Sequence, residues 1–324
     1  MISDLGLIDA PLRPYAATQE TIEVLNPATG EVLGAIEKMS ALDIKASIGR
    51  AEAEFSRWRM KSAHERAGIL KKWAALMLER RNEIARIVTL EQGKPLREAQ
   101  GEVDYAAAFI EWLAEESRRT YGETIPGHKA NIRLSTIRQP IGVVAAITPW
   151  NFPLAMITRK AGAALAAGCT IIVKPAEQTP YSAFAIQKLA VEAGVPEDAL
   201  ILVTGDPSEI GEVLTKDARI RKLSITGSTK VGSLLYRQSA ATVKKLSLEL
   251  GGNAPFIVFD DADIDQAVEA ALASKFRNAG QTCVCADRFY VQDTIYDAFA
   301  MTFAKRVSEL RVGNGLEATP EVGL

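Results

Sequence analysis

The run Val143-Val144-Ala145-Ala146-Ile147 is short, apolar and unbroken, and a polar turn and a helical pattern over residues 154–167 follow it. The same order recurs three times downstream. Strand-like runs span residues 170–173, 200–203 and 223–225, and helical patterns span residues 182–193, 208–214 and 229–240. Strands that read as continuous apolar runs and are joined by helices predict a parallel sheet with both faces covered. We therefore expect an α/β fold with a Rossmann-like parallel sheet.

The segments on either side of this core have their own patterns. Strands are predicted over residues 20–25 and 32–34, helices over 43–59, 62–91 and 98–121, and one half-exposed strand over 132–139. In the last of these helices, Phe109, Trp112 and Leu113 are expected to form the core face. Beyond Gly251, strands over 254–259 and 289–291 alternate with helices over 263–275 and 294–310. This order predicts a second α/β unit.

Composition excludes several classes of protein. The net charge of −2, from 40 acidic and 38 basic residues, gives no reason to expect a nucleic acid or membrane partner. No apolar run is long enough for a transmembrane helix, and the first residues lack the pattern of a secretory signal. The three cysteines, Cys169, Cys283 and Cys285, are too few for a disulfide framework or a four-ligand zinc site. We expect a cytoplasmic protein without a metal.

Two motifs suggest covalent chemistry. Cys283 ends a turn-like sequence, GQTC, and Glu249 lies in LELGG, between apolar residues and a glycine pair. A cysteine hydrolase would use a histidine as its base, but His64 and His128 are the only histidines and lie far from both motifs. A carboxylate whose pKa is raised by an apolar pocket could act as the base instead.

The expected sheet would gather ligand-binding loops beyond its strands' carboxyl ends. Gly227 and Ser228 begin a glycine-containing turn that is not a P-loop, and the turn alone leaves nucleotide binding and plain close packing both open. Lys174 and Glu177 place a cation and a carboxylate at another strand end. The carboxylate could accept hydrogen bonds from a ribose, or the two residues could form an ordinary surface ion pair. Asn151, in TPWNFP, is either a turn former or an amide donor to an oxyanion.

Five of these segments together resemble the aldehyde dehydrogenase superfamily. They are TPWNFP (148–153), KPAE (174–177), ITGST (225–229), LELGG (248–252) and NAGQTC (278–283). The segments YGETIPG (121–127), MITRKAG (156–162) and KFRNAGQTCVC (275–285) more narrowly resemble bacterial succinate-semialdehyde dehydrogenases. The resemblance runs from about residue 20 to the last residue.

The resemblance implies a reaction and a role for each motif. Cys283 would attack the aldehyde to give a thiohemiacetal, and the Asn151 amide and the Cys283 backbone N–H would hold the oxyanion. After hydride transfer to the nicotinamide, Glu249 would activate the water that hydrolyses the thioester. The positions that match the family's cofactor contacts are Thr148, Pro149, Trp150, Lys174, Glu177, Gly227, Ser228 and Leu250. Because Glu177 would repel a 2′-phosphate, NAD is expected rather than NADP.

The resemblance also implies a substrate, and the two-residue spacing of Cys283 and Cys285 suggests a regulatory device. Arg159 and Arg277 match positions that clamp the carboxylate of succinate semialdehyde, although Arg277 could instead be a helix-end ion-pair partner. Glutarate semialdehyde remains an alternative, since one methylene discriminates weakly. Cys285 could form a reversible disulfide with Cys283, or it could be a small buried apolar residue.

By resemblance, residues 1–127 and 143–250 form the NAD-binding domain, and residues 128–142 a strand segment for oligomerisation. Residues 251–324 would be an incomplete catalytic domain, because roughly the last third of the family's fold is missing. We therefore expect the last thirty or so residues to be poorly anchored and the chain not to turn over aldehyde alone. Homo-oligomers are usual in the family but doubtful here without the C-terminal strand. The alternative function is an inactive chain that at most binds nucleotide or pairs with full-length relatives.

Overall fold

A five-stranded parallel sheet forms the centre of the computed structural model, which describes residue 7, residues 20–318 and residues 320–323. Its strands are β5 (Val143–Ile147), β6 (Thr170–Lys174), β7 (Leu200–Leu202), β8 (Ile220–Thr226) and β9 (Lys245–Glu249). Their order is β7-β6-β5-β8-β9, so the chain builds outward from β5 on one side and then on the other. This order is Rossmann-like and confirms the predicted α/β class.

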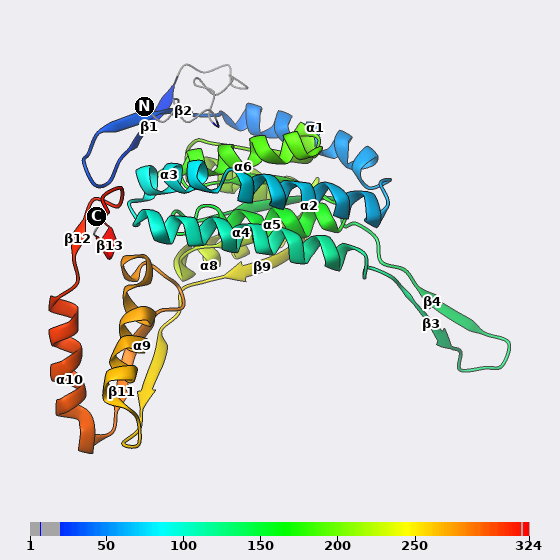
Figure 1. Ribbon diagram of the computed structural model, residues 1–324. Helices are drawn as coiled ribbons and strands as arrows, with labels where there is room; N and C mark the ends of the chain where they lie inside the picture. Colours follow the sequence, from blue (N-terminus) through cyan, green and yellow to red (C-terminus); the bar gives the residue numbers. More distant parts are fainter. Residues whose placement is uncertain (1–6, 8–19, 319, 324) are drawn as a thin grey trace.

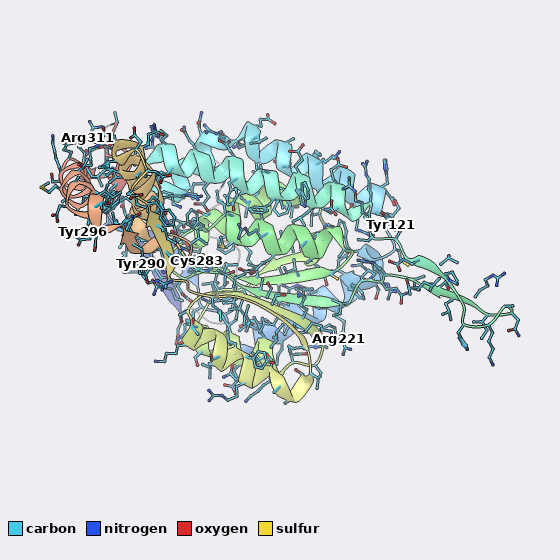
Figure 2. All side chains as sticks on the ribbon, turned by 90° about the horizontal axis from the view of Figure 1, so that it is seen from below. Tyr121, Arg221, Cys283, Tyr290, Tyr296 and Arg311 are labelled. Atoms are coloured by element: carbon cyan, nitrogen blue, oxygen red, sulfur yellow. The ribbon has the colours of Figure 1, made fainter. Side chains whose placement is uncertain are left out.

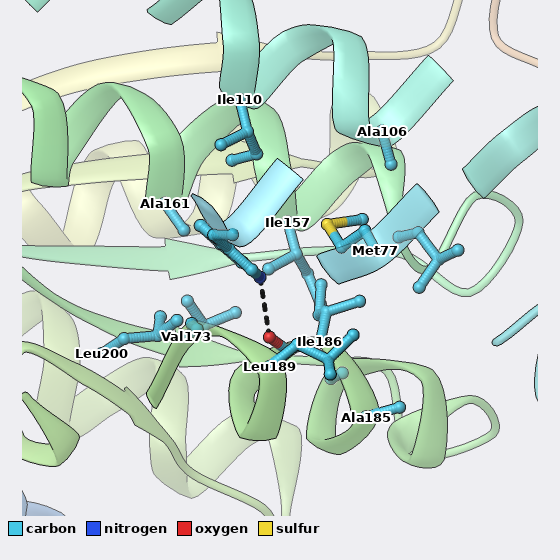
Figure 3. Packing of buried hydrophobic residues seen from close by; sticks show 14 of the residues in the cluster. Met77, Ala106, Ile110, Ile157, Ala161, Val173, Ala185, Ile186, Leu189 and Leu200 are labelled. Carbon is cyan, nitrogen blue, oxygen red and sulfur yellow. Dashed lines mark hydrogen bonds between the residues drawn. The ribbon is translucent and has the colours of Figure 1, made fainter. Parts of the chain in front are cut away.

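Helices cover both faces of the sheet (Figure 1). They are α1 (Ala41–Trp58), α2 (Ala63–Glu79), α3 (Arg81–Gln92), α4 (Leu96–Ser117), α5 (Ala155–Ala166), α6 (Pro180–Ala193), α7 (Pro207–Lys216) and α8 (Thr229–Ser239). Alternate residues of β5 face opposite layers, as strand geometry requires. Val144 packs with residues of α2 to α6, including Met77, Ile157 and Ile186 (Figure 3), whereas Val143 packs with residues of α1, α7 and α8. Strands β5, β6 and β7 are thus buried on both sides.

Two predictions about the helical region were wrong. The helix predicted over residues 62–91 is two helices, because the backbone of Arg80 leaves helical geometry with φ −96° and ψ 21°. Trp112 is not in the core but 66% exposed. The buried face of α4 is instead made of small and branched residues at helical spacing, among them Val103, Ala106 and Ile110.

Two hairpins lie outside the sheet. The first joins β1 (Thr21–Leu25) to β2 (Val32–Glu37), and the second joins β3 (Glu123–Pro126) to β4 (Arg133–Thr136). The sequence predicted a single strand over residues 132–139, whereas β4 is shorter and pairs with β3. Every residue of β3 and β4 is exposed, and the hairpin extends away from the body of the molecule (Figure 1).

The second unit is smaller. Its parallel strands β10 (Ala254–Val258) and β11 (Ala286–Val291) pack with α9 (Ile264–Phe276) and α10 (Asp293–Ser308). The short strands β12 (Val312–Gly313) and β13 (Val322–Gly323) pair near the end of the described residues. The 3-10 turns in the described part of the chain are η2 (Glu197–Ala199), η3 (Ala240–Thr242) and η4 (Arg277–Gly280). None of the described helices is long and apolar enough to cross a bilayer.

The end of the described chain packs against the turn between α3 and α4. The backbone N–H of Leu96 donates to the carbonyl of Gly315 at 2.9 Å. Gly323 lies so close to this turn that an added Cβ would come within 1.9 Å of the Gly93 carbonyl oxygen. The expectation that this segment is poorly anchored considered only apolar side chains and not these backbone contacts, and it stays a prediction.

Candidate active site

The predicted ligand-binding loops meet at the carboxyl edge of the sheet. The N–H of Thr148, after β5, donates to the carbonyl of Lys174 on β6 at 3.1 Å. On the other side of β5, the N–H of Gly227 donates to the carbonyl of Glu249 at 3.0 Å. Four predicted site residues are thus brought to one edge, across the point where the strand order reverses. Thr148 and Lys174 are buried, whereas Pro149 and Trp150 lead outward and Trp150 is 39% exposed.

The end of β8 has the features of a cradle for a dinucleotide. Thr226 Oγ1 is buried and has no partner among the described residues, and a Cβ added to Gly227 would meet no atom within 4 Å. Ser228 caps α8, its side chain accepting from the N–H of Val231. Behind the turn, Leu250 packs where an added Cβ of Gly232 would clash at 2.5 Å. An open, polar helix start fits the cofactor that the family resemblance implies.

Lys174 and Glu177 form an ion pair at the end of β6, on the other side of β5 from this turn. The side chain of Lys174 is 6% exposed and that of Glu177 is 21% exposed. The carboxylate predicted to discriminate against a 2′-phosphate therefore has a cation against it, and the resulting repulsion is weaker than that of a lone carboxylate.

Cys283 is exposed and follows a turn with unusual backbone geometry. The residues Asn278, Ala279 and Gly280 all have positive φ angles, of 52°, 55° and 76°. Left-handed geometry in residues other than glycine persists only where contacts impose it. The contacts here come from the loop after β5 and from α4.

Asn151 connects that loop to the turn that carries Cys283. Its side-chain Nδ2 donates to the carbonyl of Gln281 at 2.7 Å, and its own carbonyl accepts from Asn278 Nδ2 at 2.8 Å. An amide nitrogen has two hydrogens, so the second N–H of Asn151 is available for another acceptor.

Glu249 lies at the end of β9 and is exposed. The apolar pocket expected around this carboxylate is therefore not formed by the residues that the structure describes. The following glycines do approach the thiol segment: a Cβ added to Gly252 would lie 2.6 Å from the carbonyl oxygen of Cys283. Figure 2 shows Cys283 where the second unit meets the end of the sheet.

Cys285 is buried, and its Sγ lies within hydrogen-bonding distance of two carbonyl oxygens, 3.3 Å from Gly280 and 3.2 Å from Thr282. Both cysteines of this segment are free thiols, as is the buried Cys169. Cys285 thus packs into the turn while Cys283 stands at its surface.

The two predicted substrate-binding arginines rest on aromatic rings. The Arg159 guanidinium carbon lies 4.4 Å from the ring centroid of Phe109, and the side chain hydrogen-bonds the hydroxyl of Tyr105. Arg277 is exposed and lies 5.2 Å from the ring centroid of Phe152. Stacking of this kind orients a guanidinium while leaving donors on its edges.

Sequence reasoning missed three charged residues near the site. Lys94 and Glu102 form a buried ion pair below the Asn151 loop. Lys160, on α5, donates to Ser224 Oγ at 3.0 Å, and burial lowers its pKa to about 8, against the attraction of Glu249. Lys160 lies inside a recognised motif, but no local signal marks Lys94 or Glu102, because their contacts are made across the fold.

The fold and the site together define a Rossmann-like α/β protein that carries an exposed thiol at the carboxyl edge of its sheet. The chain belongs to the aldehyde dehydrogenase family, whose model matches residues 15–323. This membership confirms the resemblance of the five motifs.

Individual relatives are similar over nearly all of the chain. Succinate-semialdehyde dehydrogenase [NADP(+)] GabD of Escherichia coli is 59% identical over 94% of this chain and 63% of its own length. Glutarate-semialdehyde dehydrogenase of Pseudomonas putida is 58% identical over the same shares. A crystal structure of an aldehyde dehydrogenase from Brucella melitensis biovar abortus superimposes with a TM-score of 0.94 at 58% identity, covering 95% of this chain and 64% of that one. The chain thus spans slightly less than two thirds of the length of these relatives.

Proposed function

We propose that this site oxidises a short semialdehyde, with succinate semialdehyde foremost, to its carboxylic acid with NAD. The observation that carries the proposal is the bond of 2.7 Å from the Asn151 amide to the carbonyl of Gln281, two residues before Cys283. It joins a candidate oxyanion donor to the segment of a candidate nucleophile. The family and the similar semialdehyde dehydrogenases support the same reaction.

In the first half of the proposed reaction, the Cys283 thiolate attacks the aldehyde carbon. A C–S bond forms, the carbonyl π electrons move to oxygen, and the second N–H of Asn151 and the backbone N–H of Cys283 stabilise the oxyanion. The residues proposed to hold the cofactor are Thr148, Pro149, Trp150, Lys174, Glu177, Gly227, Ser228 and Leu250. When bound, the nicotinamide would supply the acceptor for the hydride whose loss from the former aldehyde carbon converts the thiohemiacetal into a thioester.

In the second half, water attacks the thioester carbon at Cys283 while Glu249 accepts a proton from that water. The C–S bond breaks, the thiolate is released and the acid leaves. An exposed Glu249 is accessible to this water, and the close approach of Gly252 to Cys283 keeps the two segments together.

We propose NAD rather than NADP as the cofactor, because Glu177 matches the family position at which a carboxylate would repel a 2′-phosphate. The similar E. coli protein is named for NADP(+), so this assignment concerns the present chain and its own residue. The substrate's carboxylate would be bound by Arg159 and Arg277, whose stacked guanidinium groups suit bidentate contacts. A substrate one methylene longer, glutarate semialdehyde, is the nearest competitor.

Three further assignments accompany this proposal. The exposed β3–β4 hairpin and residues 128–142 would contact another copy of the chain or a relative, since unpaired strand edges favour pairing. Cys285 would form a reversible disulfide with Cys283 when a peroxide oxidises the two thiols and is itself reduced to water or an alcohol. The compartment would be the cytoplasm, where free thiols persist.

The competing function is nucleotide binding without turnover. It is favoured by the exposure of Glu249 and of apolar residues in the second unit, among them Ile257 and Phe259 at 58% and 64%. A site this open leaves the reacting groups in water, where electrostatic stabilisation is weaker.

Two measurements on the intact chain separate these functions. Titration calorimetry reports NAD binding, and absorbance of the reduced cofactor reports oxidation of succinate semialdehyde. Reduction that Cys283→Ser abolishes would support the enzyme, and binding without reduction would support the alternative. A chain that does neither would overturn both proposals.

A further inference from the structure

Lys94 and Glu102 form an ion pair that is almost completely withdrawn from water. Each side chain is 1% exposed, and Lys94 Nζ lies 2.5 Å from Glu102 Oε2. Lys94 belongs to the turn before α4, and Glu102 to the second turn of that helix. Removing two charges from water costs so much free energy that apolar residues of similar volume are often as stabilising. Stability alone therefore does not account for this pair.

Both members of the pair contact the loop that carries Asn151. Lys94 Nζ donates to the carbonyl of Asn151 at 2.9 Å. Glu102 Oε1 accepts from the backbone N–H groups of Leu154, at 2.9 Å, and Ala155, at 3.3 Å, where α5 begins. The pair thus holds the loop at the asparagine and again at its far end.

The same carbonyl continues the network to the thiol segment. Asn278 Nδ2 donates to the Asn151 carbonyl at 2.8 Å. This oxygen therefore accepts one hydrogen bond from the ion pair, through Lys94, and one from the turn that precedes Cys283. The backbone N–H of Asn278 donates in turn to Glu98 on α4 at 2.8 Å. These contacts hold the left-handed backbone of Asn278, five residues before Cys283.

We propose that Lys94 and Glu102 are positioning residues, whose ion pair fixes the Asn151 carbonyl and thereby sets the Asn151 amide against the Cys283 turn. The inference rests on the proposed function, which makes Asn151 and Cys283 the reacting pair. Without the ammonium, the Asn151 carbonyl loses one of its two donors, and the loop keeps only its attachment through Glu102 at the far end. Both segments then move relative to each other while the sheet stays intact.

Hydrogen exchange measured by mass spectrometry on the full chain tests this arrangement. Lys94→Met is expected to speed exchange about tenfold or more in peptides covering residues 148–156 and 276–286. Peptides from β6 and β8 should exchange as in the parent. The double variant Lys94→Met/Glu102→Gln removes both charges but keeps an acceptor for Leu154. It should release the same two segments with a higher melting temperature than the single variant, since no buried charge is left unpaired.

Lys244 provides a matched control. It is also a buried lysine, and it donates to the carbonyls of Leu214 and Asp217, at the amino end of β9 and away from the site. Lys244→Met should lower the melting temperature without speeding exchange in residues 148–156 or 276–286. Parent-like exchange of these segments in Lys94→Met would overturn the proposal, as would equal acceleration in both lysine variants. Neither outcome depends on cofactor binding or aldehyde oxidation, so the proposed function stands or fails separately.

Discussion

The central sheet and the second unit are built from the same alternation of strand and helix, but they differ in how their strands are covered. Every residue of β6 is buried, and so are the first four of β5. In the second unit, Ile257 on β10 is 58% exposed and Tyr290 on β11 is 52% exposed. The same alternation of strand and helix has thus produced a central sheet whose inner strands are buried on both faces and a second sheet that is buried on one face only.

This difference shows that pattern determines the elements, whereas burial determines how firmly they are held. The apolar cluster of the second unit has five buried members, Val258, Val268, Ala271, Leu272 and Phe299. The second unit contacts the region that contains the central sheet through hydrogen bonds of the backbone at Gly315 and Asn278, among others. We therefore expect the second unit to open at a lower free energy than the sheet.

The largest expected loss of stability comes from a substitution in the core of the region that contains the central sheet, which is called the first region below. Trp73 is fully buried in α2, and its indole N–H donates to the carbonyl of Ile186 at 2.9 Å. Trp73→Ala should lower the free energy of unfolding by about 3–5 kcal/mol through the cavity and the loss of the indole hydrogen bond. Denaturant unfolding followed by circular dichroism would measure this loss.

The matched change in the second unit is Phe299→Ala, at a side chain 3% exposed. It should loosen residues 254–310 in hydrogen exchange while the main unfolding transition stays near that of the parent. A single transition, displaced as far as in Trp73→Ala, would show that the two regions unfold as one.

A second prediction uses pH. Burial lowers the pKa of Lys160, on α5, to about 8, from an ordinary value near 10.5. Between these values the unfolded chain binds more protons than the folded one, so this lysine makes stability rise with pH from about 8 to 10. Lys160→Met should remove up to about 2–3 kcal/mol of that rise.

Unfolding midpoints in urea at pH 7, 8, 9 and 10 would measure the slope. Lys244 contributes in the same window, because burial lowers its pKa to about 8 as well. The variant should therefore keep part of the rise, and a slope equal to that of the parent would contradict the assignment.

A smaller effect is expected at the cofactor edge of the first region. Glu177→Ser should narrow the preference for NAD over NADP by a factor of about 5–10, near the lower end of a like-charge effect, because Lys174 already neutralises part of the carboxylate charge. Calorimetric titration of parent and variant with both cofactors gives the ratio. NADP binding as tight as NAD binding in the parent would show that Glu177 does not discriminate.

The smallest effects are expected at helix starts, where the two regions can be compared directly. Ser62 forms a capping box with Glu65 at α2, and Asp263 caps α9 by accepting from the N–H of Gln266. Each change to alanine should cost about 1 kcal/mol. Ser62→Ala should shift the main transition, and Asp263→Ala should speed exchange only in α9. Equal global shifts would argue against separate opening of the second unit.

Much of the site could be predicted from the sequence because parallel strands end at a common edge. The apolar runs located β5, β6 and β8, and the polar residues that follow them had to lie near one another. The strand that carries Glu249 was less visible, since β9 is an edge strand with exposed and half-buried residues. Burial of Trp112 was predicted wrongly because a helix pattern does not reveal where the neighbouring helices lie.

The buried ion pair that holds the Asn151 loop could not be predicted from the sequence. The contacts of Lys94 and Glu102 join the α3–α4 turn to a loop more than fifty residues later, and neither residue forms part of a recognisable motif. Such charges look in the sequence like members of a solvated helix face, and only the packed structure withdraws them from water.

The strand order also has a consequence for how the molecule is made. As the chain leaves the ribosome, β5, β6 and β7 emerge in the order in which they pair, so that half of the sheet can assemble at once. β8 must then return to the opposite side of β5, and β9 follows at the edge with Glu249. Cys283 is synthesised later still. We therefore expect the exposed thiol of Cys283 to emerge from the ribosome only after all five strands of the sheet have been synthesised.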